Sequence, residues 1–538
     1  MWYIFAQKSN ILNIPIPEVL EKILLEIQKQ NGTGYLVGGI VRDSLFNEIH
    51  KTNFKPKDYD VEVFRLPYEK LIEILSKFGN VSEVGKSFGV IKLNAGGEDY
   101  DFSLPRTESK SGHKHQDFAV TSNPNLSEKD AASRRDVTIN SILFDPLTNN
   151  LIDNYNGVDD IKNKVLKHTS DAFSEDPLRV LRLLSLGSRF GLSLAPETAE
   201  LAQSIREEYK HLPKERVYEE FKKLVTKGIE PGKALDFLYT TGWSENFPEI
   251  HNLRGTPQEP EWHPEGDVDV HTAYVMNEAA NIAERENLSP EDREVLIYSA
   301  LAHDFAKPDT TAVINKKGID RITSHGHEEQ GGPKARAFLE SIGAPKNIID
   351  KVVPLVEFHL SHIHHSNTPK QEAFVKSLAE KIHPANIRML ELLIEADHSG
   401  RPPLPKELPA EARQMSDLAK QYNVYEHKHP DLLQGRDIMP YLGNKGGPII
   451  GEILKEHRKL ILEHNPAMES RESALAWLHK RMQRIASFID GNDVQQVLGI
   501  QGPAIKLMLD EAWKAQNMGL FNDRAGALQW LESQKETT

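Results

Sequence analysis

The sequence predicts an α+β protein, with strands near its amino terminus and helices further along. The run YLVGGIVRDSLF, residues 35–46, reads as a buried strand that stops at two glycines and continues with apolar residues at helical spacing. The runs DYDVEVF, residues 58–64, and EDYDFS, residues 98–103, alternate in the way that strands do. Closer to the carboxyl end, two glycine-proline pairs each lead into an apolar helical segment.

The length and composition of the chain narrow its class. At 538 residues it exceeds the roughly 100 to 200 residues of an ordinary domain, so several domains are expected. Apolar residues make up 39% of it, and no window approaches the roughly 18 uninterrupted apolar residues of a membrane span. Because cysteine is absent and the amino terminus has no export leader, we expect a soluble, cytoplasmic protein. The net charge of −14 argues against indiscriminate binding to nucleic acid and leaves room for a local basic groove.

The glycine turn and the alternating strands indicate a particular chemistry. Gly38 and Gly39 stand where a phosphate could approach the backbone N–H groups at a helix amino terminus. Asp58 and Asp60 share one face of a strand, so they repel each other unless a cation lies between them. Oxygen ligands combined with substrate phosphates suit Mg²⁺, and Asp101 offers a third carboxylate from a neighbouring strand.

These motifs, together with the segments that follow them, resemble a known family. GGxVRD and DxD are followed by RRDVTINSILFDP (134–146), DNYNGVDDI (153–161), EDPLRVLRLLSLGSRFGLSL (175–194) and KERVYEEF (214–221). The order is that of the class II tRNA nucleotidyltransferase and poly(A) polymerase family. The resemblance implies a polymerase-β-type mixed-sheet head over residues 1–150 and an all-helical neck over residues 151–250 that selects the incoming nucleotide.

The resemblance also implies roles for single residues. Three carboxylates should be catalytic in a two-metal transfer, in which an RNA 3′-hydroxyl displaces pyrophosphate from CTP or ATP: Asp58, Asp60 and Asp101. Arg42 should join the two glycines in binding the triphosphate, and Asp43 should help to shape the turn. Arg135 should contact the nucleotide, and Asp136 should accept a hydrogen bond from the ribose 2′-hydroxyl.

The neck motif explains how such an enzyme can work without a template. Asp176, Arg179 and Arg182 follow one another at intervals of three, so on a helix they would share one face. A carboxylate acceptor and a guanidinium fork can pair with the Watson–Crick edge of cytosine and, after a small shift, with that of adenine. The alternative is an ordinary exposed salt bridge on a helix. Arg216 and Glu220 resemble the family motif that braces the neck.

The segment over residues 107–133 is polar and rich in turn formers, and we interpret it as a mobile loop. In the family such a loop helps the site to switch from cytidine to adenosine addition. Its full length here favours synthesis of the complete CCA sequence.

A second set of motifs begins near residue 262 and resembles the HD phosphohydrolase superfamily. The family order of histidines and aspartates is completed here by His327 and His359, and the predicted metal ligands are His271, His303, Asp304 and Asp397. Imidazole and carboxylate ligands suit Ni²⁺, Mn²⁺ or Fe²⁺, with Mg²⁺ as a further option. The resemblance implies an all-helical HD domain over residues 255–425, with phosphatase and 2′,3′-cyclic phosphodiesterase activity on RNA ends or nucleotides.

The last hundred residues contain an internal repeat. The pattern GxDxxxxLG, followed by a glycine-proline pair, occurs from Gly435 and again from Gly491. In each copy the helix that starts at proline could hold one RNA phosphate, so we predict RNA contacts at Gly447, Gly502 and Lys445. Two ordinary glycine-capped helix pairs remain the alternative. This helical tail is expected to span residues 430–538.

Taken together, the motifs predict an enzyme that adds CCA to the 3′ end of tRNA from CTP and ATP. Two other classes remain open. One is a poly(A) polymerase, or a partial enzyme that adds only CC or only A. The other is an HD phosphohydrolase whose head is a non-catalytic RNA-binding module. The oligomeric state is open.

Overall fold

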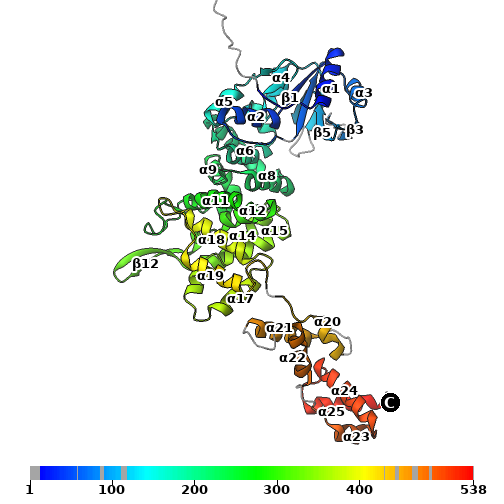
Figure 1. Cartoon of the computed structure of the whole chain (residues 1–538). Coiled ribbons are helices and arrows are strands. Elements are labelled where there is room, and N and C mark those ends of the chain that lie inside the picture. The colour runs from blue at the N-terminus through cyan, green and yellow to red at the C-terminus, as the bar shows by residue number, and fades with distance from the viewer. Residues whose placement is uncertain are drawn as a thin grey trace, which may run out of the picture. The chain divides into compact units, whose positions relative to one another are not determined.

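The computed structural model describes residues 12–56, 58–84, 90–110, 118–428, 430–442, 447–462, 470–483 and 488–536. The chain forms two compact units (Figure 1). The first comprises Met1–Leu360 with Met389–Pro409, and the second comprises Ser361–Arg388 with Ala410–Thr538. No helix among the described residues is long and apolar enough to cross a membrane.

The first unit opens with a seven-stranded mixed sheet in the order β3-β4-β5-β2-β1-β8-β9. Its strands are β1 (Thr33–Val37), β2 (Tyr59–Phe64), β3 (Asn80–Val84), β4 (Val90–Ala95), β5 (Glu98–Ser103), β8 (Leu143–Asp145) and β9 (Asn150–Ile152). β2 and β5 pair in parallel, with Asp60 opposite Asp101, whereas the other neighbours pair antiparallel. The predicted mixed-sheet head is confirmed.

Short helices complete the head: α1 (Glu18–Lys29), α2 (Gly39–His50), α3 (Tyr68–Leu75), α4 (Glu128–Ser133) and α5 (Gly157–Asn163). The apolar residues of α1 recur every three or four positions, so they form one stripe that is buried in the head: Leu20, Ile23, Leu24 and Ile27.

The segment predicted to be a mobile loop contains regular structure, which corrects that interpretation. β6 (Arg106–Lys110) and β7 (Phe118–Ser122) form an antiparallel pair, and α4 follows. The Ser127 hydroxyl caps α4 by accepting a hydrogen bond from the Asp130 N–H. A polar composition therefore concealed strand alternation and a helix cap. Residues 111–117 lie outside the described part of the chain.

The neck consists of α6 (Leu178–Phe190), α7 (Pro196–Ser204), α8 (Lys214–Lys227), α9 (Lys233–Thr240) and α10 (Pro248–His251). A short parallel pair, β10 (Val165–Leu166) with β11 (Ser193–Leu194), accompanies these helices. α6 packs against α8, and the Ser185 hydroxyl donates to the buried Glu220 carboxylate at 3.3 Å. That contact fits the bracing role expected of Glu220.

The HD-like region is built mainly from α11 (Val268–Arg285), α12 (Pro290–Ala302), α13 (Lys307–Thr310), α14 (His327–Ser341), α15 (Lys346–Glu357) and α18 (Ile387–Ser399). Gly400 follows α18, and a Cβ atom there would lie 2.5 to 3.0 Å from atoms of Val275 on α11. Glycine thus permits the close approach of these two segments, which carry His271 and Asp397.

An antiparallel hairpin interrupts the helices of this region, where only helices had been predicted. Its strands are β12 (Thr311–Lys316) and β13 (Ile319–Ser324) (Figure 1). Lys317 and Gly318, which join them, both have positive φ, as a type I′ hairpin turn requires. The two strands and their turn have a local sequence pattern, but the motifs around them predicted only helices.

The second unit contains α16 (Ser361–Ser366), α17 (Gln371–Lys381), α19 (Ala410–Gln421), α20 (Gly435–Ile438), α21 (Pro448–Leu462), α22 (Arg471–Gln483), α23 (Gly491–Leu498), α24 (Pro503–Asn517) and α25 (Arg524–Ser533). The internal repeat corresponds to two hydrophobic cores, one centred on α20–α22 and one on α23–α25. In the first copy Arg471 donates to Asp437 at 2.7 Å, and in the second Arg524 donates to Asp493 at the same distance. The two copies therefore share a structural framework as well as a sequence pattern.

Candidate functional site

The turn between β1 and α2 presents its backbone to a cavity. Gly38 has φ 70° and ψ −128°, a conformation that favours glycine. A Cβ atom on Gly38 would lie 3.6 Å from a carboxylate oxygen of Asp60 and 3.8 Å from Nη1 of Arg135. Gly39 is the first residue of α2. The predicted phosphate-binding turn thus lies beside the predicted metal ligand.

Arg42 and Asp43 hold this turn in place. The Arg42 guanidinium donates to Asp43 Oδ1 at 2.7 and 2.9 Å and to Asn140 Oδ1 at 2.7 Å. Arg189 of α6 donates to the other Asp43 oxygen at 2.6 Å, so the neck is tied to the head here. Arg42 is buried, and the structure supports its turn-shaping role, whereas its contact with a triphosphate stays a prediction.

The three predicted catalytic carboxylates come from β2, from the residue before it and from β5. Burial raises the pKa of Asp60 to about 6, with Asp101 and Asp58 adding to the effect and Arg135 opposing it. Lys92 lies 3.2 Å from Asp101. Burial and two neighbouring negative charges destabilise the ionised form of Asp60, and a bound cation would stabilise it. The three carboxylates offer only oxygen ligands, which suit Mg²⁺.

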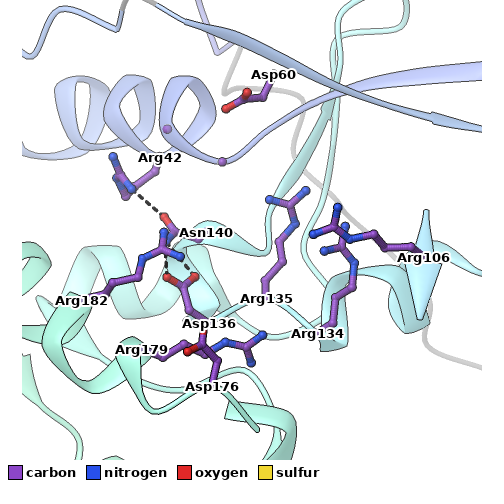
Figure 2. Close-up of a pocket in the computed structure, with 12 residues that line it drawn as sticks. Arg42, Asp60, Arg106, Arg134, Arg135, Asp136, Asn140, Asp176, Arg179 and Arg182 are labelled. Atoms are coloured by element: carbon purple, nitrogen blue, oxygen red, sulfur yellow. Dashed lines mark hydrogen bonds and ion pairs between the residues drawn. The ribbon is translucent and has the colours of Figure 1, made fainter. Parts of the chain in front are cut away.

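A cavity of about 330 Å³ is lined by Asp60, but not by Asp58 or Asp101, and by residues of the neck (Figure 2). Its lining contains six arginines and three aspartates, besides the two glycines and Asn140: Arg42, Arg106, Arg134, Arg135, Arg179, Arg182, Asp60, Asp136 and Asp176. The excess of guanidinium groups suits a polyanion such as a nucleoside triphosphate. All the predicted nucleotide-binding residues meet here.

Glu62 positions two of these arginines and was not predicted. Its side chain is fully buried and accepts from Arg134 at 2.8 Å and from Arg135 at 3.1 Å. Burial alone would raise the pKa of Glu62, but Arg135 and Arg134 hold it below its usual value. The signal was present in the sequence, because Glu62 shares its strand face with Asp58 and Asp60.

Asp136 is buried, and both of its carboxylate oxygens have hydrogen-bond or ion-pair partners. One of its oxygens accepts from the Val137 N–H at 2.9 Å and from the Asn140 amide at 3.0 Å, while the other lies 3.2 Å from Arg182. Burial would raise the pKa of Asp136, but Arg182 and the hydrogen bonds hold it below its usual value. The carboxylate is therefore ionised and can accept a further hydrogen bond.

Asp176 and Arg179 both reach the cavity, but not through one helix face as the sequence predicted. α6 begins at Leu178 after Pro177, and Asp176 precedes it in an extended conformation. Its carboxylate accepts from the Leu178 N–H at 3.1 Å, and Arg179 donates to the Ala172 carbonyl at 2.7 Å. The proline explains the difference, because the residue before a proline disfavours helical backbone. Both side chains line the same cavity (Figure 2).

A second cavity of about 330 Å³ shares Gly39, Arg42 and Asp60 with the first. Its other lining residues are Ile40, Asp43, Lys55, Pro56, Asp58, Arg189 and Lys227. Asp60 thus lies between two basic cavities, an arrangement suited to a reaction that joins two phosphate-bearing substrates.

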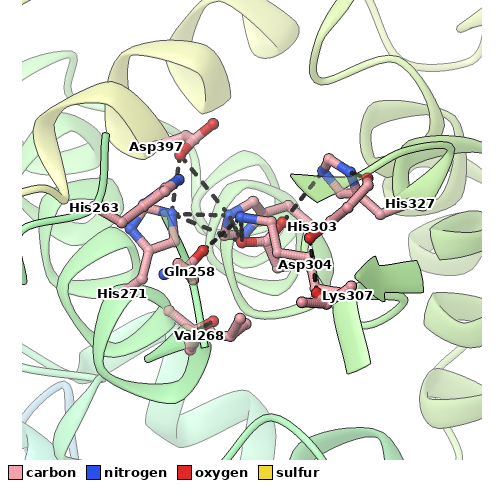
Figure 3. A network of polar contacts seen from close by, with 12 residues as sticks. Gln258, His263, Val268, His271, His303, Asp304, Lys307, His327 and Asp397 are labelled. Atoms are coloured by element: carbon pink, nitrogen blue, oxygen red, sulfur yellow. Dashed lines mark hydrogen bonds and ion pairs between the residues drawn. The ribbon is translucent and has the colours of Figure 1, made fainter. Parts of the chain in front are cut away.

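The HD motif residues form a separate polar cluster (Figure 3). His271 Nε2 lies 3.0 Å from Asp397 and 3.3 Å from His303 Nε2. Asp304 extends from this group to a second one, with oxygens 3.2 Å from His303 Nε2 and 3.4 Å from His327 Nε2. All four predicted ligands are therefore brought together, and His327 and His359 lie beside them.

The second imidazole pair shows why this cluster fits a cation. His327 and His359 donate their Nδ1–H groups to backbone carbonyls at 2.7 Å, and their Nε2 atoms face each other at 3.2 Å. Burial lowers the pKa of His327 and lowers that of His359 to about 3, so both rings are neutral. Two lone pairs at this separation repel unless a cation lies between them, and imidazole ligands suit a transition metal.

Residues that the sequence motifs did not include orient this cluster. Glu265 lies 2.7 Å from Nδ1 of His271, so it fixes that ring in the way that outer carboxylates orient metal-bound histidines. Burial lowers the pKa of His271, but Asp397 and Glu265 raise it to about 9. Lys307, itself buried, lies 2.7 Å from Asp304.

The predicted RNA contacts of the tail are only partly described. Gly502 caps α24 with φ 64°, and Gly447 directly precedes α21. Lys445 lies outside the described residues. An RNA role for these positions stays a prediction.

Three family matches cover successive parts of the chain. Residues 34–167 match the poly A polymerase head domain, and residues 268–416 match the HD domain. Residues 191–253 match a segment described as a "probable RNA and SrmB-binding site of polymerase A".

The chain is similar to two curated relatives, each described as a multifunctional CCA protein. The relative from Hahella chejuensis is 32% identical over 376 residues, which cover 68% of this chain and 82% of the relative. That from Pasteurella multocida is 33% identical over 379 residues, which cover 68% and 84%.

Solved structures share the fold at lower identity. A CCA-adding enzyme of Bacillus stearothermophilus in complex with CTP matches with a TM-score of 0.57 at 20% identity, over 87% of this chain and 98% of that one. A Thermotoga maritima CCA-adding enzyme complexed with tRNA matches with a TM-score of 0.51 at 17% identity, over 88% and 97%.

Proposed function

The chain belongs to the family of CCA-adding tRNA nucleotidyltransferases and poly(A) polymerases, and on this premise we propose that it adds the complete CCA sequence to the 3′ end of tRNA from CTP and ATP. One observation carries the proposal. A single arginine-rich cavity joins the glycine turn, the Asp60 carboxylate and the pair Asp176 and Arg179. The cavity offers a place for a triphosphate, a reacting centre and a base-reading pair together.

In this proposal each part of the nucleotide has its own partners. The triphosphate lies against Gly38 and Gly39, where the amino terminus of α2 offers backbone N–H groups. The ribose 2′-hydroxyl donates to Asp136, while Asp176 and Arg179 pair with the edge of the base. The nucleotide is thereby held so that its α-phosphate faces the carboxylates.

The acceptor RNA would enter from the second cavity. Lys55 and Lys227 line it and could contact phosphates near the RNA end. The RNA 3′-hydroxyl loses its proton to solvent and its oxygen forms a bond to the α-phosphorus. The bond between the α-phosphorus and the oxygen that bridges to the β-phosphate breaks, and pyrophosphate leaves with that oxygen. Asp58, Asp60 and Asp101 would hold Mg²⁺, which supplies charge neutralisation and acidifies the attacking hydroxyl.

Incubation with tRNA lacking its 3′ end tests this proposal. CTP alone should give two added cytidines, CTP with ATP should give CCA, and UTP or GTP should give no product, as read by sequencing. Long adenosine tracts from ATP alone would instead identify a poly(A) polymerase. Products that stop at CC, or addition only to tRNA ending in CC, would identify a partial enzyme. If no nucleotide is added but phosphohydrolase activity is present, the head would be a non-catalytic RNA-binding module.

The imidazole cluster supports a second activity, a metal-dependent phosphohydrolase acting on RNA ends or nucleotides. The residues that would hold the metal are His271, His303, Asp304 and Asp397, together with His327 and His359. A divalent ion supplies an activated water in such sites. With a 2′,3′-cyclic phosphate, water adds to phosphorus, one ring P–O bond breaks and the freed hydroxyl takes the proton. Assays with Ni²⁺, Mn²⁺, Fe²⁺ and Mg²⁺ test this activity, and its absence with all four would remove the proposal.

We also propose that the duplicated tail binds tRNA, because each copy presents a helix after its glycine-proline pair. We further propose a cytoplasmic location and four domains: a head over 1–150, a neck over 151–250, an HD domain over 255–425 and a tail over 430–538. Removal of residues 430–538 should weaken tRNA binding without altering NTP selectivity, as measured by filter binding and single-nucleotide addition.

A further inference from the structure

An exposed tryptophan, Trp262, directly precedes His263, whose ring packs against His271 of the imidazole cluster. The Trp262 side chain is 59% exposed. By contrast, Trp243 is fully buried, and Trp477, Trp513 and Trp530 pack against the two cores of the tail. An indole with this much exposure has a ring face that is available for stacking on a ligand.

The loop that carries Trp262 is held in shape by its own bonds. Its ends are joined where the Val268 N–H donates to the Thr256 carbonyl at 3.0 Å and the Gln258 amide donates to the Gly266 carbonyl at 3.1 Å. Three prolines in the loop reduce its conformational freedom further: Pro257, Pro260 and Pro264. Trp262 is therefore presented by a fixed loop.

The same loop is tied to the cluster on the side of the predicted ligands (Figure 3). His263, the residue after Trp262, has its ring centroid 4.7 Å from that of His271. Its Nδ1 lies 2.9 Å from Glu265, the carboxylate that orients His271. Gln258 accepts from Lys307 at 2.7 Å. The position of Trp262 relative to the phosphohydrolase centre is thus set through its immediate neighbour.

The loop also holds the β12–β13 hairpin. Glu259 accepts from the Arg321 side chain at 2.9 Å and from the Ile322 N–H at 3.0 Å. Glu261 accepts from Arg321 as well. Glu259, Glu261 and Glu265 all have hydrogen-bond or ion-pair partners, and these contacts anchor the loop. Trp262 is the large side chain of the loop that is exposed to solvent.

We propose that Trp262 stacks on the base of the nucleotide whose phosphate is hydrolysed at the imidazole cluster, an inference that rests on the proposed phosphohydrolase activity. Every base has a π face, so stacking on an aromatic ring tolerates sequence differences. A hydrolase for RNA ends needs that tolerance. The substrate class is accordingly a base-bearing nucleotide or RNA end, and a sugar phosphate without a base should be a poor substrate.

The test compares two substrates on Trp262→Ala, Trp262→Phe and the wild type. One substrate is adenosine 2′,3′-cyclic phosphate, and the other is the 2,3-cyclic phosphate of 1-deoxyribose, which has no base. Trp262→Ala should raise KM for the first about tenfold or more, as expected for one lost stack, and leave its kcat unchanged. KM for the base-free substrate should not change, and Trp262→Phe should restore most of the affinity. Tyr274→Ala is the matched control, because Tyr274 is 42% exposed on α11 and lines a different cavity.

A binding measurement separates this inference from the activity on which it rests. Adenosine 2′-phosphate should quench indole fluorescence in the wild type and not in Trp262→Phe. If the wild type hydrolyses neither substrate with any of the four metals, the phosphohydrolase proposal fails, and quenching alone decides the role of Trp262. No quenching, or equal kinetic effects on the two substrates, would overturn base stacking. Unchanged kinetics and binding in Trp262→Ala would do the same and point to a protein contact at this position.

Discussion

The charge of Asp60 depends strongly on its surroundings. Its pKa of about 6 lies above the ordinary value of 3.8 because the side chain is largely buried and Asp101 and Asp58 lie nearby. The folded protein therefore binds a proton at Asp60 more readily than the unfolded chain does. Between these two values, stability falls as pH rises, and it stays lowered at pH 7.

Asp60→Asn should consequently stabilise the metal-free protein at pH 7 while it abolishes nucleotide addition. The gain should be at most about 3 kcal/mol, from 1.36 kcal/mol per pKa unit, and it should vanish below about pH 4. Mg²⁺ should raise the stability of the wild type and not of the variant. Urea unfolding from pH 4 to 8, with EDTA or Mg²⁺, measures each effect. Asp99→Asn on the neighbouring strand β5 should show none of them, and a stability gain that persists at pH 4 would contradict the account.

Arg179→Ala should change which nucleotide is added more than it changes RNA binding. Loss of a guanidinium that pairs with a base edge removes roughly 1–3 kcal/mol of discrimination, so the preference for CTP over UTP should fall about fivefold or more. Single-turnover addition with each NTP gives this ratio, and filter binding gives the tRNA affinity. Arg206→Ala, another neck arginine that pairs with Glu245, is the control and should keep wild-type selectivity. Intact selectivity in Arg179→Ala would refute the protein-template proposal.

At the scale of single elements, the β1–α2 turn is the part of the head that we propose holds the triphosphate. Gly38 combines a positive φ with a position beside Asp60, so a side chain there would both strain the backbone and approach the carboxylate. The backbone strain would lower the stability of the protein. Because the strain would occur beside Asp60, it should also lower the activity.

Gly38→Ala should lower stability by about 1–3 kcal/mol and reduce addition severely, because the amino terminus of α2 would shift relative to Asp60. Gly97→Ala provides the comparison, since Gly97 has φ 86° in the turn between β4 and β5 and its Cβ would meet no atom within 4 Å. That variant should lose similar stability and keep full activity. Thermal unfolding and initial rates on both proteins distinguish the two effects, and equal loss of activity would show that strain alone was responsible.

Elements with strong local patterns were predictable, whereas those that depend on tertiary partners were not. The strand alternation around Asp60 and Asp101 and the glycine turn appear in the sequence because their periodicities are local. Glu62 was overlooked because its importance arises from Arg134 and Arg135, which lie more than seventy residues later. Glu265 is comparable, since only the fold places it against His271. Asp176 was assigned to a helix because spacing by three was weighed above the effect of Pro177.

At the scale of the whole molecule, the two candidate centres use different residues and different kinds of ligand. The head offers carboxylate oxygens from a sheet, and the HD-like region offers imidazoles and carboxylates from helices. Among the residues that the structure describes, none that lines the two head cavities belongs to the imidazole cluster. The two activities should therefore be separable by substitution.

Asp304→Ala should lower phosphohydrolase activity by orders of magnitude while CCA addition survives, since the substitution removes a carboxylate that contacts both imidazole groups. Addition, hydrolysis and thermal unfolding should be measured on one preparation. Asp304→Asn, which keeps the side-chain volume beside the buried Lys307, shows whether loss of packing contributes. A parallel decline of both activities with a lowered Tm would mean that Asp304 is structural, as would wild-type hydrolysis in either variant.

α6 has one more property, which concerns length. Arg179 near its start lines the arginine-rich cavity, and Arg189 near its end is tied to Asp43 beside the β1–α2 turn. Ten residues of α-helix separate them by about 15 Å, and that span is rigid. In the proposed binding mode, the helix therefore fixes the distance between the residues at the base and those at the phosphates. An inserted residue between the two arginines would rotate one end by about 100° relative to the other, so the chain can tolerate changes of sequence in this stretch but not of its length.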